Sequence, residues 1–206
     1  MLRPHIDARV RLDDIWASRI VQQMLNALIE DLCLLNQDKF SASLGNPISQ
    51  HRAHQRLVKS RQATILEDEL YTGKRGHFTS SLVRFAAGID HIFILRQGNI
   101  GLGIGQVEHT MDRLAILTHH ALVRAVQRGG VRCTEDMITL LRYLWPNIRA
   151  VAASDQPQMV PFSGVDGQRV FAVVKKGERY PQVVSTILAE DHIAANGQQE
   201  LHDVRL

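Results

Sequence analysis

The stretch THHALVRAVQRGGVRCTEDMITLLRYLWP, residues 118–146, contains the two most clearly predicted helices of the chain. Thr118 is a favourable N-cap residue, and Gly129 provides a C-cap and turn for the first helix. Thr134, which two acidic residues follow, begins the second helix. The apolar positions of both helices recur every three or four residues, and we expect Pro146 to end the second one.

Downstream of this stretch, short apolar segments alternate with turn residues. Glycines near residues 164–167 and 177, together with Pro181, supply the turns. Four segments have the length and composition of strands: Ala150–Ala153, Met159–Phe162, Arg169–Lys176 and Val183–Ala189. Residues 107–190 are therefore predicted to form an α+β module of two helices plus an antiparallel four-strand sheet, which a C-terminal tail at residues 191–206 follows.

The first apolar stripe of the chain predicts a long N-terminal helix. Asp13 or Asp14 can cap it, and apolar residues recur at three or four positions from Trp16 to Leu35. So wide a stripe must be buried, and packing within the fold is favoured over a seam between two copies of the chain. A homo-oligomer formed through this helix remains the alternative.

The rest of residues 1–106 is predicted to be mostly helical, with one small hairpin. The pattern favours a second helix from Ser49 to about Tyr71 and a short helix near Thr79–Ala87. His91–Arg96 and Ile100–Ile104 are predicted to pair as a hairpin around Gly98. The predicted fold class is thus α+β, with a mostly helical N-terminal region ahead of the module.

The composition excludes several classes of protein. The chain has 206 residues, of which 45% are hydrophobic and 22% charged, so a wholly disordered chain is excluded. Only two cysteines are present, which excludes a disulfide framework. The charged N-terminus does not contain the apolar core of a signal peptide, and no apolar stretch reaches the length of a membrane span. We expect a cytoplasmic protein of bacterial type with no membrane contact.

The charge balance slightly favours an anionic partner. Nineteen of the 24 basic residues are Arg, whose guanidinium can make two hydrogen bonds to phosphate oxygens. An Arg-rich genome explains this excess of Arg over Lys equally well. On a helix, His120, Arg124 and Arg128 recur every four residues along one edge. Three such groups repel one another unless an anion or carboxylates lie nearby. A bound phosphate would satisfy all three, whereas a solvated basic surface is the simpler interpretation.

Other residues add to this basic character. Arg52 and Arg56 lie on the basic half of the predicted second helix. Lys175 and Lys176 are the last two residues of a predicted strand. Thr186 places a hydroxyl in an otherwise apolar strand, where it needs a hydrogen-bond partner. The GxGxG pattern that starts at residue 101 lacks the βαβ context of a dinucleotide site. No metal-binding motif is apparent, and no cofactor is predicted.

The order of these elements resembles the small metal-independent toxin ribonucleases of the barnase, colicin and RelE type. The similar residues are His120-Ala121-Leu122-Val123-Arg124, then Arg169–Lys176, then Val184-Ser185-Thr186, within roughly residues 110–190. The resemblance implies RNA cleavage without a metal, with His120 as general base or acid. Arg124 and Lys175 would stabilise the charge on phosphorus, and Thr186 would position the phosphate. Further RNA contacts are expected from Arg128, His119, Lys176, Arg52 and Arg56.

The sequence therefore predicts a protein of toxin or effector type that binds RNA and cleaves it. An inhibitor protein is a possible further partner. The alternative is a non-catalytic binding or structural module that docks nucleic acid or an acidic protein. The two hypotheses differ in whether His120 moves a proton or only contributes to a surface.

Overall fold

The computed structural model describes residues 13–35, 52, 54–55, 58–59, 64–72, 78–101, 107–190 and 193. Three helices and seven strands are assigned bounds within these ranges. Their order is α1 (Asp14–Leu35), β1 (Ile65–Thr72), β2 (Phe78–Ala87), β3 (Ile92–Gly101), β4 (Val107–Leu117), α3 (His119–Arg128), α4 (Thr134–Arg149), β5 (Gln158–Ser163), β6 (Arg169–Lys175) and β7 (Gln182–Ala189). The fold is α+β, as the sequence predicts.

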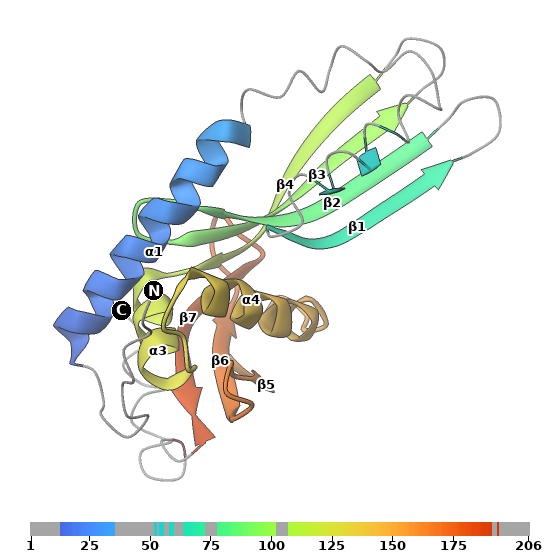
Figure 1. The fold of residues 1–206 in the computed structure, drawn as a ribbon. Helices are drawn as coiled ribbons and strands as arrows, with labels where there is room; N and C mark the ends of the chain where they lie inside the picture. Colours follow the sequence, from blue (N-terminus) through green and yellow to red (C-terminus); the bar gives the residue numbers. More distant parts are fainter. Residues whose placement is uncertain are drawn as a thin grey trace.

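All seven strands belong to one mixed, curled sheet of order β1-β2-β3-β4-β7-β6-β5. Neighbouring strands are antiparallel except β4 and β7, which run parallel over three residue pairs, from Ala115↔Gln182 to Leu117↔Val184. The chain passes from β4 to β7 through α3, α4, β5 and β6. In Figure 1 the outer ends of β1–β4 extend away from α3 and α4.

α1, α3 and α4 cover one face of the sheet. The buried side of α1 contributes Ala17, Val21, Met24, Leu25 and Leu28 to a core that includes residues of α3, α4 and six of the strands. As far as Ile29, the last α1 residue whose side chain is described, the stripe thus packs within the chain itself, as its width predicts. Trp16 is an exception to the predicted stripe, because 56% of it is exposed.

Side chains at the helix starts fix the positions of α1 and α3. Asp13 caps α1, because its Oδ1 accepts the Trp16 N–H at 2.8 Å. The Thr118 hydroxyl oxygen accepts the Ala121 N–H at 3.3 Å and donates to the Ser185 carbonyl of β7 at 3.1 Å. This one side chain therefore caps α3 and attaches it to the strand beneath.

The N-terminal region is not mostly helical, which corrects the prediction. Residues 65–72 are strand β1, residues 78–87 are strand β2, and β3 runs unbroken through Gly98 where a hairpin turn was expected. Of residues 49–64, the first part of the helix expected from Ser49 to about Tyr71, the structure describes Arg52, His54, Gln55, Val58 and Lys59 as helical and Thr64 as a turn. The others lie outside the described residues. Leu82 and Val83 point to opposite faces and are both buried, so the apolar residues of β2 do not alternate as in a half-exposed strand, and periodicity cannot distinguish this strand from a helix.

The C-terminal module also differs from its prediction. α4 continues past Pro146 to Arg149 because Ile148 extends the buried stripe; burying such a side chain contributes about 1.5–3 kcal/mol against the cost of an interior proline. Residues 150–153 form a turn and bend rather than a strand. Within this module the antiparallel pairing involves three strands, β5, β6 and β7, and the fourth strand, β4, pairs with β7 in parallel.

β4 belongs to both halves of the molecule. It begins at Val107, where the C-terminal module was expected to start, and pairs with β3 on one side and β7 on the other. Of the expected tail at residues 191–206, the structure describes only Ile193. Within the described ranges, no helix combines the length and apolar character needed to cross a membrane.

Candidate functional site

An open hollow of about 680 Å³ lies where the start of α1 meets the start of α3. Ile15 and Val123 give it apolar walls. Its polar side chains come from both helices: Asp14, Ser18 and Arg19 from α1, and His119 and His120 from α3. Since α3 is held against β7 by Thr118, the two histidines have a fixed place at the mouth of the hollow.

His119 is held by α1. Its Nε2 lies 3.0 Å from Ser18 Oγ, while its Nδ1 is buried and makes no hydrogen bond within the part of the chain that the structure describes. A buried N–H without a partner is rarer in proteins than a buried acceptor without one, so we infer that the proton lies on Nε2 and is donated to Ser18. His119 therefore forms a wall of the hollow that its contact with α1 holds in place.

His120 has a different environment, because it is exposed at the edge of the hollow beside Asp14. A hydrogen bond from Gln127 and the positive charge of Arg124 lower the pKa of the Asp14 carboxyl, with smaller contributions from His120 and Arg128. The Asp14 carboxylate therefore lies within electrostatic range of His120. Of the two histidines, His120 is the better placed to gain and lose a proton.

Asp14 is the carboxylate that the basic edge of α3 requires. Arg124 Nη1 lies 3.2 Å from Asp14 Oδ1, and Gln127 Nε2 donates to the same oxygen at 2.8 Å. Arg128 instead donates from Nη1 to the Ile187 carbonyl of β7 at 3.3 Å. The edge predicted from the spacing is present, but a side chain of α1 supplies part of the compensating charge.

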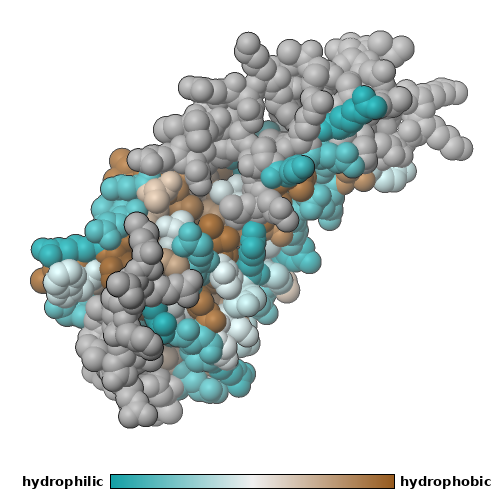
Figure 2. Space-filling model, viewed as in Figure 1, coloured by the Kyte–Doolittle hydropathy of each residue, from teal (hydrophilic) through white to brown (hydrophobic). Residues whose placement is uncertain are grey.

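The start of α1 contributes a cation to the rim and places an exposed aromatic ring beside that cation. The Arg19 guanidinium lies 5.3 Å from the centre of the Trp16 ring and also lines the hollow. Ile15 is 64% exposed beside them. In Figure 2, hydrophobic and hydrophilic side chains lie next to one another over this end of the molecule.

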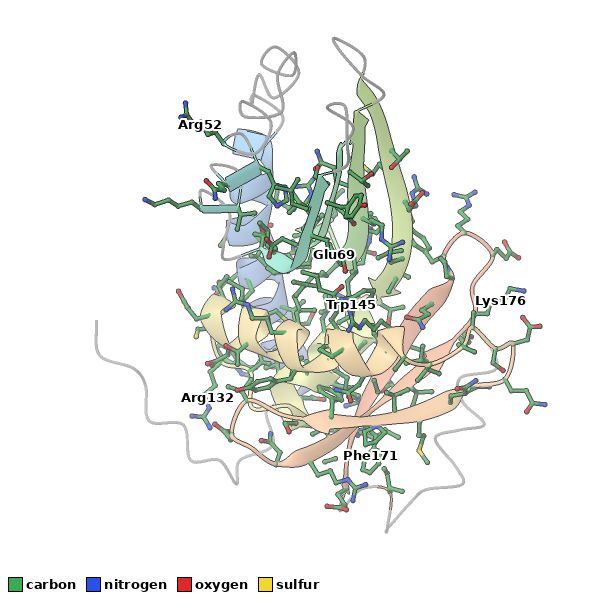
Figure 3. The ribbon with its side chains drawn as sticks, turned by 90° about the vertical axis from the view of Figure 1, so that its right-hand side faces the viewer. Arg52, Glu69, Arg132, Trp145, Phe171 and Lys176 are labelled. Carbon is green, nitrogen blue, oxygen red and sulfur yellow. The ribbon has the colours of Figure 1, made fainter. Side chains whose placement is uncertain are left out.

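Lys175 and Thr186 do not lie at the hollow. Along β6, Val170, Ala172 and Val174 belong to the core, so Phe171, Val173 and Lys175 lie on the opposite face of the sheet. Thr186 of β7 pairs with Val173 and lies on that same face. Figure 3 shows Phe171 on the side of β6 away from α4. Because Lys175 and Thr186 share the face of Phe171, the sheet separates them from His120 and Arg124.

The remaining predicted contacts also lie elsewhere. Lys176 is exposed in the turn after β6, with its Nζ 3.8 Å from Asp155 Oδ1. Arg52 is exposed and lies two residues before His54. The Nε2 atom of His54 is 3.6 Å from Asp68 Oδ2 of β1. This part of the molecule is far from α3 (Figures 1 and 3). Arg56 lies outside the described residues. The structure therefore brings together His119, His120 and Arg124, with Arg128 farther along the same helix.

Three residues of the hollow were missed by the sequence reasoning: Asp14 as a charge partner, Ser18 and Arg19. Ser18 and Arg19 flank the buried stripe of α1, but nothing in their spacing relates them to α3, about one hundred residues later. In the described parts of the chain, no group of three or more His, Cys, Asp or Glu side chains is arranged to hold a metal ion.

Comparisons with known proteins identify no relative of this chain. No protein-family model, no curated protein and no solved structure matches this chain. The resemblance to toxin ribonucleases therefore rests on the short motifs in the sequence.

Proposed function

We propose that this protein binds RNA at the hollow between α1 and α3 and cleaves it without a metal ion, with His120 as the proton-transfer group. One observation carries the proposal: an exposed histidine and Arg19 line the same hollow as an oriented carboxylate, which pairs with Arg124. Arginine binds phosphate oxygens, and histidine exchanges protons near neutral pH. Lys175 and Thr186, on the other face of the sheet, have no part in this proposed site.

The chemistry requires little beyond these groups. His120 takes the proton of a ribose 2′-hydroxyl, whose oxygen then forms a bond to the adjacent phosphorus. The bond from phosphorus to the 5′-oxygen breaks, and this oxygen takes a proton from water, which the open hollow admits. Arg19 and the α3 arginines stabilise the charge that develops on the phosphate oxygens. The products are a 2′,3′-cyclic phosphate and a 5′-hydroxyl.

Binding of RNA without cleavage is the second candidate function. It is favoured by the ion pair between Asp14 and Arg124, which offsets part of the charge available to a phosphate. It is also favoured by the position of Lys175 and Thr186, because the hollow lacks two of the groups expected from the ribonuclease resemblance. An RNA-binding surface needs neither a general base nor a full set of phosphate-stabilising groups.

The test is cleavage of end-labelled RNA in the presence of a chelator, followed on a denaturing gel. We expect His120→Ala to lower the cleavage rate by about 10²–10⁴-fold while RNA binding persists. His91→Gln, which changes an imidazole in the turn between β2 and β3, is the matched control and should leave the rate unchanged.

Two results would contradict the catalytic proposal. Cleavage that is equally fast in His120→Ala would remove His120 from the reaction. RNA that binds to the wild-type protein and stays intact in the chelator would favour the binding module instead. If RNA does not bind at all, both functions fail.

A further inference from the structure

Trp16 is exposed where the sequence pattern predicts burial. Because 56% of Trp16 is exposed to solvent, its indole is not buried as a Trp side chain in a protein core is. Its neighbour Ile15 is 64% exposed on the adjoining side of α1. Ile15 lines the hollow, and Trp16 contacts Arg19, which also lines it. These two large apolar side chains form an exposed surface that a ligand can cover.

The hollow beside Trp16 combines apolar walls with a cationic rim. Ile15 and Val123 provide the walls, and Arg19 stands between the hollow and the Trp16 ring. Ser18 also lines the hollow, and its Oγ lies within hydrogen-bond distance of His119 Nε2. An apolar pocket with a few convergent polar groups is typical of small-ligand recognition.

A nucleotide has the matching chemistry. Its base is a flat ring with polar edges, and its phosphate is an anion that Arg19 and the α3 arginines can attract. Proteins that bind single-stranded nucleic acid use this same pairing of aromatic stacking with a positive groove. A cation stacked on the ring, as Arg19 is on Trp16, adds to such binding surfaces.

We propose that Trp16 and the adjoining hollow bind unpaired bases, so that single-stranded RNA is the substrate class of the site. This inference rests on the proposed function and specifies it. In a duplex the bases are stacked and paired, and the deep, narrow major groove of A-form RNA keeps side chains from their edges. A strand whose base lies on Trp16 has its phosphates near Arg19 and His120, which line the same hollow.

The experiment uses a short mixed-sequence 2′-O-methyl oligoribonucleotide, which lacks the nucleophilic hydroxyl and so stays intact. Trp16 and Trp145 are the two tryptophans of the chain, and Trp145 is only 4% exposed. A base that stacks on Trp16 quenches the fluorescence of the exposed indole. We expect quenching on binding of the single strand, and at least tenfold weaker binding by Trp16→Ala. The same strand annealed to its complement should also bind at least tenfold more weakly.

Tyr143→Ala is the matched control, because Tyr143 is an exposed aromatic residue on α4. It should bind the single strand as the wild type does, and far-UV circular dichroism checks that each variant is folded. If RNA binds but Trp16→Ala keeps the wild-type affinity and no quenching occurs, this inference is overturned and the proposed function stands. If no RNA binds while polyglutamate quenches Trp16, the surface recognises acidic proteins, and both proposals fail.

Discussion

Asp14 is the residue that balances the charges of the hollow. It lies at the first turn of α1, where a carboxylate also interacts favourably with the helix dipole. Gln127 and Arg124 approach the same carboxylate oxygen, so the side chain is oriented although it is largely exposed. The contribution of this group to stability is therefore small and depends on its ionisation.

Asp14→Asn should lower stability at neutral pH and should also remove part of its pH dependence. The pKa of Asp14 is lower in the folded state than its usual value of 3.8, so the carboxylate stabilises the fold above about that pH. This stabilisation is lost as the pH falls through the lower folded-state pKa. The midpoint of urea unfolding should thus be higher for the wild type at pH 7, with the difference narrowing below pH 3.8.

Glu178→Gln provides the control for this comparison, because Glu178 is exposed in the turn between β6 and β7. Its midpoint should follow the wild type at both pH values. A difference between wild type and Asp14→Asn that stays constant from pH 7 to pH 3 would mean that the charge of Asp14 is not what stabilises the fold.

The spacing of His120, Arg124 and Arg128 indicated a missing anion but could not identify it. The edge repeats every four residues, which a single helix encodes locally. Asp14 comes from another helix, 110 residues before Arg124, and its approach depends on how α1 packs on α3. The need for an anion is thus predictable from the sequence, whereas the residue that meets it follows from tertiary packing.

At the scale of elements, Glu67 links the outer strands to α4. Its Oε1 accepts the Trp145 indole N–H at 2.8 Å and also pairs with Arg149 at the end of the helix. Figure 3 shows Trp145 between α4 and the strands. β1 is an edge strand, so this contact attaches the far edge of the sheet to the helical layer.

Removing the Glu67 carboxylate should loosen this attachment. Glu67→Ala leaves the partly buried Trp145 N–H without its acceptor, which should cost about 1–3 kcal/mol of unfolding free energy. Glu67→Gln keeps an acceptor and loses mainly a surface ion pair, so it should cost only about 0–1 kcal/mol. Equilibrium urea unfolding followed by tryptophan fluorescence measures both.

Glu69→Ala tests whether the effect is specific to this contact. Glu69 is exposed on the same strand, and its replacement should change stability by less than about 0.5 kcal/mol. Equal losses for Glu67→Ala and Glu69→Ala would show that the acidic composition of β1 matters rather than the bond to Trp145.

The same elements show where sequence patterns mislead. The α1, α3 and α4 helices were predicted because their apolar stripes, together with the side-chain caps of α1 and α3, are local signals. Residues 65–70, ILEDEL, favour a helix by composition, yet they pair with β2 as a strand. Pairing of Ile65 with Arg84 and Leu70 with Ser80 satisfies the backbone and overrides the weak intrinsic preference of Leu and Glu for helices.

At the scale of the whole molecule, one core joins the two regions that the sequence separates. Val21 and Leu25 of α1 belong to the same buried cluster as Leu122 of α3 and Val174 of β6. The sheet continues across the junction of β4 and β7, where Gln182 donates from Nε2 to the Ile148 and Val151 carbonyls. The C-terminal elements are thus covered in part by residues that precede them.

A fragment of residues 107–190 should therefore fail to fold alone. Without α1, the buried face of α3 is exposed, and without β3, strand β4 keeps only its short parallel pairing with β7. The loss of several large core contacts, each worth about 1.5–3 kcal/mol, is comparable with the whole typical stability of a domain, about 5–15 kcal/mol. The fragment should show little near-UV circular dichroism and no cooperative unfolding, whereas the full chain unfolds in one transition by both fluorescence and far-UV signal. A fragment that unfolds cooperatively would establish residues 107–190 as an independent domain, and the hollow at α1 would then lie between two units rather than within one.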